Sequence, residues 1–174
     1  MSQIQIGWAR RDVSTSEPLN LPGQFYMRIS KGIMDPVTVT AMAVENNGQK
    51  AVFVSADMID CRHGLLDEVR SLAEKRIPEL DPEQILMAVT HTHTGPSHLN
   101  GLGAISIPTD EPFPHDGVEI GSAEAYRHFL ADSIASAVEG RGFGASIYDN
   151  IVTPEAGQIL VEETLSELES IFEE

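Results

Sequence analysis

Two alternating segments, Val37-Thr-Val-Thr-Ala-Met-Ala-Val44 and Ala51-Val-Phe-Val-Ser55, decide the fold together with the turn Asn46-Asn47-Gly48 between them. Both segments are rich in the β-branched residues that favour strands. Asn and Gly tolerate the positive φ angles that a tight hairpin turn requires. The sequence therefore predicts an antiparallel hairpin over residues 37–55.

Further strands and helices are predicted on either side of this hairpin. Ile4 and Ile6 alternate with glutamines and open a strand that runs to about Ala9, and residues 84–89 form a short apolar run typical of a buried strand. Apolar residues at helical spacing predict a helix from residue 65 that ends before Pro78. A second helix is expected after Ser122 as N-cap, and its apolar positions are Tyr126, Phe129, Leu130, Ile134, Ala137 and Val138.

The end of the chain predicts one more strand, over residues 145–152, and one more helix. Thr153-Pro154-Glu155 has the N-cap, first-turn proline and acidic residue of a helix start. The apolar side of this helix would consist of Leu160, Val161, Leu165, Leu168, Ile171 and Phe172. The order of elements predicts an α/β layer fold, a mixed sheet with an N-terminal hairpin flanked by amphipathic helices.

Composition indicates a single soluble domain over residues 1–174, with 41% hydrophobic residues. The net charge of −16 argues against nucleic acid or an anionic membrane as partner. No apolar run is long enough to cross a bilayer, and no signal peptide is visible at the N-terminus. A single cysteine, Cys61, excludes an internal disulfide and is typical of a reducing compartment, so we expect a cytoplasmic protein.

The segment Thr90-His91-Thr92-His93-Thr94-Gly95-Pro96 follows the predicted strand 84–89. On an extended backbone, residues i and i+2 point to the same face, so His91 and His93 can converge on one point. Imidazole is the commonest metal ligand, and an open catalytic zinc site needs about three protein ligands and a water. The two histidines therefore indicate half of a metal site, although such a pair can equally cap a loop or hydrogen-bond carbonyl groups.

Other polar residues are candidates for the same site. Asp57 ends the return strand of the hairpin, where it can cap the following helix or orient an imidazole. Arg28 belongs to a cationic segment, residues 10–31, whose charges are either solvated or include an arginine that meets an anionic substrate group. The loop over residues 94–121 offers further possible ligands, each more typical of a solvated side chain: His98, Asp110, Glu111, His115 and Asp116.

Cys61 and His63, at the start of the first helix, allow a different chemistry. A thiol near a helix N-terminus can have a lowered pKa, which would suit a cysteine-dependent hydrolase. Catalytic Cys and His usually come from separate segments, so this is the weakest of the candidate sites.

Four motifs lie in order between residues 4 and 98: Ile6-Gly-Trp-Ala-Arg-Arg-Asp-Val-Ser14, Arg28-Ile-Ser-Lys-Gly-Ile-Met-Asp-Pro36, Val52-Phe-Val-Ser-Ala-Asp57 and Thr90-His-Thr-His-Thr-Gly-Pro96. Together they resemble the neutral/alkaline non-lysosomal ceramidases and their shorter bacterial relatives. Residues 123–139 are similar to the helix that follows the histidine motif in that family, and residues 144–172 to its closing strand and helix.

The resemblance implies a zinc amidase that cleaves the N-acyl bond of ceramide or of a related small-molecule or lipid substrate. It implies that His91 is a zinc ligand and that His93 hydrogen-bonds the bound water or the developing oxyanion. Asp57 would orient an imidazole, and Arg28 is the candidate substrate-binding residue. Zinc chemistry agrees with such roles, because the metal lowers the pKa of its water to about 7 and polarises a carbonyl.

The chain departs from the family by its length. Family members have a longer catalytic domain whose later segments supply a second histidine, a glutamate and a tyrosine to the zinc. Here the middle is missing, so the domain is abridged: residues 1–139 match the N-terminal part and residues 140–174 the closing part. The alternative function is therefore a catalytically inactive α/β scaffold with an incomplete metal site. Missing sheet partners would expose a strand edge, so a homo-oligomer is also expected to be possible.

Overall fold

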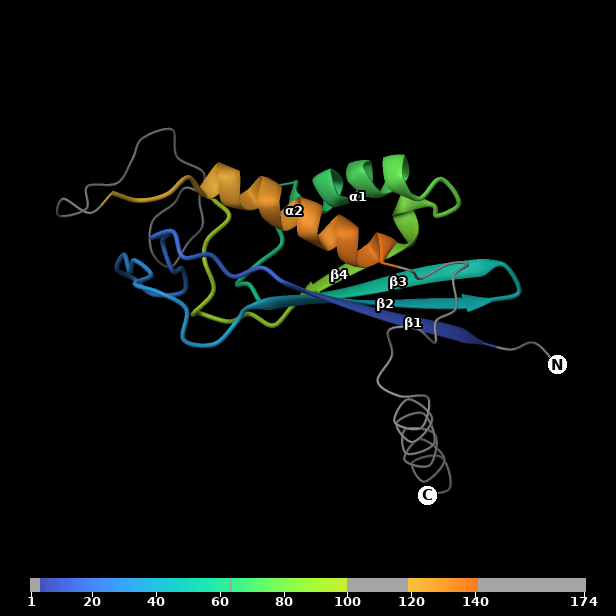
Figure 1. Ribbon diagram of the computed structural model, residues 1–174, viewed down its shortest axis with the longest axis horizontal. Coiled ribbons are helices and arrows are strands. Elements are labelled where there is room, and N and C mark those ends of the chain that lie inside the picture. Colours follow the sequence, from blue (N-terminus) through green and yellow to red (C-terminus); the bar gives the residue numbers. More distant parts are fainter. Residues whose placement is uncertain (1–3, 63, 100–118, 141–174) are drawn as a thin grey trace, which may run out of the picture.

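The computed structural model describes residues 4–62, 64–99 and 119–140, which form a mixed four-stranded sheet with two helices on one of its faces (Figure 1). The strands lie in the order β1-β2-β3-β4; the first two pairings are antiparallel and β3 and β4 are parallel. Their bounds are β1 (Gln5–Asp12), β2 (Thr38–Asn46), β3 (Gln49–Ala56) and β4 (Ile85–Val89). The predicted α/β fold with an N-terminal hairpin and a mixed sheet is confirmed.

The turn between β2 and β3 has the predicted chemistry. Asn47 and Gly48 both have positive φ, 52° and 78°, as the two central residues of a tight hairpin turn require. Asn46 pairs with Gln49 directly across this turn, and pairing then continues to Val39 and Ala56. Strand β1 is longer than predicted, because its pairing with β2 continues past Ala9 to Asp12.

Helices α1 (Leu65–Arg76) and α2 (Ala123–Glu139) begin and end close to the predicted positions. The hydroxyl of Ser122 accepts a hydrogen bond from the Ala125 N–H at 3.1 Å, which is the predicted N-cap of α2. Both helices bury an apolar stripe against small and branched side chains of the central strands. The core includes Val39, Ala41, Ala43, Val52, Val54, Leu65, Val69, Leu130 and Ile134.

Phe129 departs from the predicted apolar side of α2, since it is 46% exposed while Leu130 is buried. The helix turns about 100° per residue, so the stripe through Tyr126, Leu130 and Ile134 faces the sheet and leaves Phe129 at its flank. Its ring lies against the ring of Tyr126, with centroids 6.1 Å apart. The phenylalanine thus covers the rim of the core instead of filling it.

Ion pairs join the two helices at both ends of their contact. On α1, Arg76 donates to the Ser136 hydroxyl at 3.0 Å and pairs with Asp132. Near the other end, the Arg127 guanidinium donates to the Glu68 carboxylate at 3.1 Å. These pairs hold α1 and α2 side by side above the sheet (Figure 1).

Several predictions fall outside the described residues: the strand over 145–152, the helix that begins at Thr153, and positions 100–118 of the long loop. The division of the chain into residues 1–139 and 140–174 likewise stays a prediction. In the part of the chain that the structure describes, no helix combines the length and the apolar character that a bilayer crossing requires.

Candidate functional site

The candidate site lies at the carboxyl ends of β3 and β4. These strands are parallel and Ala56 pairs with Val89, so the segments that follow them leave the sheet at the same edge. The Thr90 N–H donates to the Ala56 carbonyl at 3.0 Å, which extends the contact beyond the strands. Residues 19–30 form a third segment, attached where the Ser97 N–H donates to the Asn20 carbonyl at 2.8 Å.

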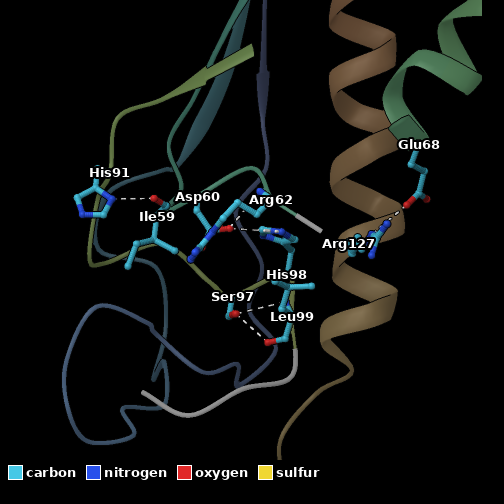
Figure 2. A network of polar contacts seen from close by, with 9 residues as sticks. All are labelled: Ile59, Asp60, Arg62, Glu68, His91, Ser97, His98, Leu99 and Arg127. Carbon is cyan, nitrogen blue, oxygen red and sulfur yellow. Dashed lines mark hydrogen bonds and ion pairs between the residues drawn. The ribbon is translucent and has the colours of Figure 1, made fainter. Parts of the chain in front are cut away.

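His91 occupies a left-handed backbone conformation, with φ of 58°, immediately after β4. Its side chain is exposed, and Nδ1 lies 2.8 Å from the carbonyl oxygen of Ile59 (Figure 2). A carbonyl oxygen only accepts hydrogen bonds, so Nδ1 carries a proton, and in the neutral imidazole Nε2 then has the lone pair. Histidine ligands of metals usually have their second nitrogen occupied in this way, which suits Nε2 of His91 for a metal.

His93 lies beside His91, but not through the extended backbone from which their convergence was predicted, because His91 has a positive φ. The two ring centroids are 5.0 Å apart, and the rings meet edge to face. On its other side the imidazole of His93 touches Gly23, where a Cβ atom would clash with the ring. Gly23 also has φ of 99°, so both its backbone and the ring contact favour glycine. The position of His93 therefore depends on a residue far away in the sequence.

Arg28 holds the segment 19–30 against the histidine segment. Its Nη2 atom donates to the carbonyl oxygen of Pro22 at 3.1 Å and to that of His93. A guanidinium presents several N–H donors in a rigid fork, which suits it to bridge two stretches of backbone. This positioning contact was not predicted from the sequence, while the role of Arg28 toward a substrate stays a prediction.

Asp57 joins β3 to the start of β2. Its Oδ2 atom accepts hydrogen bonds from both the N–H and the hydroxyl of Thr38, each at 2.9 Å. It does not cap the next helix, because the N-cap of α1 is Gly64 and makes no side-chain capping bond. The role of Asp57 toward an imidazole is untested by these contacts and stays a prediction.

His98 is 2% exposed, so the expectation of a solvated loop residue is wrong for this position. The turn around it directs the ring inward, since the Ser97 hydroxyl donates to the Leu99 carbonyl at 2.8 Å (Figure 2). Nε2 of His98 lies 3.9 Å from the carboxylate of Asp60, which pairs with Arg62 at 2.7 Å. Hydrogen bonding to Asp60 raises the pKa of the Arg62 guanidinium above its ordinary value.

The described residues do not form a complete metal site. Within residues 4–62, 64–99 and 119–140, no group of three or more His, Cys, Asp or Glu side chains is arranged to hold a metal ion. Cys61 is a free, partly buried thiol, and its predicted partner His63 lies outside the described residues. So do the remaining candidate ligands of the long loop, Asp110, Glu111, His115 and Asp116.

Comparison with known proteins finds solved structures of the same fold. No protein-family model and no curated protein matches the chain. The structure is similar to that of neutral ceramidase from Pseudomonas aeruginosa, with a TM-score of 0.58 and 19% sequence identity over 78% of this chain. It is also similar to a ceramidase complexed with C2, with a TM-score of 0.57 and 18% identity over 77% of this chain.

The likeness covers a small part of those proteins. This chain spans 21% of the Pseudomonas aeruginosa neutral ceramidase and 20% of the second ceramidase structure. At this level of identity, the comparison establishes a shared fold in the region that overlaps.

Proposed function

We propose that the chain is a ceramidase-like domain that cleaves an N-acyl amide bond of ceramide or a related N-acyl substrate, using a zinc ion held in part by His91. The observation that carries this proposal is the hydrogen bond between Nδ1 of His91 and the Ile59 carbonyl, which leaves Nε2 for a metal. The shared fold with two ceramidase structures supports the choice of reaction.

The residues around His91 would divide the work of amide hydrolysis. When bound, zinc would supply a Lewis acid and a water of lowered pKa. The imidazole of His93, 5.0 Å from that of His91, would hydrogen-bond the developing oxyanion or pass a proton to the leaving amine. Arg28 and Gly23 would keep this ring in place from the opposite side. Water adds to the acyl carbon, the C–N bond breaks, and the amine leaves with the transferred proton.

The second candidate function is a non-catalytic scaffold. It is favoured by the ligand count, because the described residues bring no third metal-binding side chain to His91 and His93. The two candidates differ in whether the purified chain retains a stoichiometric metal ion.

The decisive experiment is elemental mass spectrometry of the purified full chain and of two histidine variants. We expect about one zinc per chain in the wild type, in keeping with a mononuclear site, and its loss in His91→Ala. His128→Ala is the matched control, because this histidine is exposed on α2 and pairs with Glu68 away from the candidate site. Zinc far below one per chain, unchanged by His91→Ala, would refute the enzyme and leave the scaffold. Retention of zinc in the control would justify assays on N-acyl substrates.

The setting of this activity also remains a proposal. The substrate would be a small molecule or a lipid with an N-acyl group, and the reaction would take place in the cytoplasm. Self-association is part of the same proposal, and light scattering of the purified chain measures it directly.

A further inference from the structure

The face of the sheet opposite the helices carries a row of large apolar side chains, one from each strand. Trp8 of β1 pairs with Met42 of β2, Met42 with Phe53 of β3, and Phe53 with Leu86 of β4. Trp8 is 45% exposed, Phe53 45% and Leu86 51%. The row therefore crosses the whole described sheet on its open side.

One of the two neighbouring rows on this open face is also apolar, while the other contains Arg10, Thr40 and Ser55. Ile6 pairs with Val44, and Val44 pairs with Ala51. Each of these residues lies two positions along its strand from the corresponding residue of the row. An antiparallel sheet that faces water on one side normally alternates apolar inward and polar outward residues. Here the side chains under the helices are small or branched, such as Ala41 and Ala43, while the larger ones lie on the open face. This distribution is typical of a sheet that is covered on both faces.

The end of α2 places the rest of the chain beside the edge of this sheet. Gly140 lies against β1, since a Cβ atom on it would be 3.0 Å from Cβ of Ala9. The segment 141–174 follows Gly140 in the sequence. Residues 141–152 reach at most about 40 Å when fully extended. The axes of four strands, separated by three spacings of about 4.8 Å, span roughly 14 Å, so this linker is long enough to pass the edge and reach the open face.

The sequence after this linker has one apolar side and one acidic side. Val161, Leu165, Leu168 and Phe172 are spaced by four, three and four residues, which places them on one side of a helix. Residues 153–174 contain seven glutamates and no lysine or arginine. On the open face of the sheet, Arg10 is exposed two residues from Trp8, where it could pair with one of these glutamates.

We infer that residues 153–172 form a helix that packs on the open face and covers the row of Trp8, Met42, Phe53 and Leu86. Such a helix would be about 30 Å long, enough to cross the four strands. The alternative occupant is the same face of a second copy. The chain's own segment is tethered within reach of this face, so its effective concentration there is high, which favours it over a second copy. This inference does not depend on the proposed enzymatic activity.

Trp8 is the single tryptophan of the chain, so its fluorescence measures whether the open face is covered. We expect blue-shifted emission and weak acrylamide quenching in the full chain. Leu165→Glu together with Leu168→Glu should shift the emission to the red and raise the quenching constant severalfold. Glu167→Gln, on the opposite side of the expected helix, is the matched control and should change neither. Far-UV circular dichroism checks that the double variant remains folded.

Two results would overturn the inference. The first is wild-type emission typical of a solvent-exposed tryptophan, which would mean that nothing covers the face. The second is blue-shifted emission that appears only in a dimer resolved by light scattering, which would identify a second copy as the occupant.

A disulfide test gives a second, independent measurement in a Cys61→Ser background. Phe53→Cys with Leu165→Cys should form an intramolecular disulfide under mild oxidation, because the inferred packing brings these positions together. Phe53→Cys with Glu167→Cys is the control and should remain reduced. Equal cross-linking of both pairs would contradict the inferred orientation of the helix.

Discussion

The two parts of this molecule are held together by different forces. Beneath α1 and α2, Leu65, Leu130 and Ile134 are at most 1% exposed and pack on the apolar side of the sheet. At the carboxyl ends of β3 and β4, the loops are instead held by polar contacts, such as those of Arg28 and Asp57 with backbone groups. The helix-covered part should therefore determine the global stability of the protein. The conformation of the candidate site should instead depend on a few polar side chains, so that substitution of one of them alters it.

The largest expected effect on stability belongs to the helix-covered part. Leu130→Ala should lower the free energy of unfolding by about 2–5 kcal/mol, because it leaves a cavity under α2. Denaturant unfolding followed by far-UV circular dichroism measures this loss. Phe129→Ala is the matched control on the same helix, and we expect it to cost about 1 kcal/mol or less, since this ring is 46% exposed. Equal losses would contradict the described orientation of α2.

Asp57→Ala tests the polar attachment between β3 and β2. The substitution removes the carboxylate that accepts hydrogen bonds from the N–H and the hydroxyl of Thr38. It should lower the free energy of unfolding by about 1.5–3 kcal/mol. A double-mutant cycle with Thr38→Ala isolates the bond to the hydroxyl, and we expect a coupling energy of about 1 kcal/mol. Additive losses would show that the two side chains do not interact.

Gly23→Ala should move His93 with a moderate loss of stability. A residue with a side chain at positive φ costs about 1–2 kcal/mol, and here the new methyl group also meets the imidazole. NMR shifts of the His93 ring should change strongly. Gly48→Ala is the control, because this glycine also has positive φ but has open space around it. Gly48→Ala should lower the free energy of unfolding by a similar amount, because of the positive φ, and should leave the NMR shifts of His93 unchanged.

Tyr126→Phe should have the smallest effect at neutral pH, about 1 kcal/mol, through loss of the hydrogen bond to the Val13 carbonyl. Burial, with a smaller contribution from Asp12, raises the pKa of the Tyr126 hydroxyl above its ordinary value of 10.0. Above pH 10 the unfolded chain loses this proton before the folded chain does, so the wild type should lose stability as the pH rises.

The measurement for Tyr126 is the difference in unfolding free energy between wild type and variant across pH 8 to 11. Below about pH 10 the difference should be constant, and above it the advantage of the wild type should shrink. A difference that does not vary with pH would contradict a buried, neutral hydroxyl.

Local patterns were sufficient for the elements of secondary structure. The hairpin follows from Asn47 and Gly48, whose positive φ angles are available to these residue types, and α2 begins after Ser122 because its hydroxyl satisfies a free N–H. Phe129 was misplaced because periodicity defines a stripe but not its width. That width depends on how much of the helix the sheet and α1 cover.

The contacts of the site were largely beyond the reach of such patterns. The burial of His98 and the ion pair between Asp60 and Arg62 give no periodic signal in the sequence. Arg28 reaches the carbonyl of His93 across 65 positions of the chain. Gly23 lies in a stretch with several Gly and Pro residues, which is typical of irregular backbone, but its contact with His93 gives no local signal.

By itself, the sequence determined the strands and helices of the described part of the chain, because these follow from interactions between residues close in the chain. The tertiary structure alone decided that His91 donates to the Ile59 carbonyl, that His93 rests on Gly23, and which face of the sheet the helices cover. These contacts join distant segments, and their geometry exists only once the sheet and its loops have packed together.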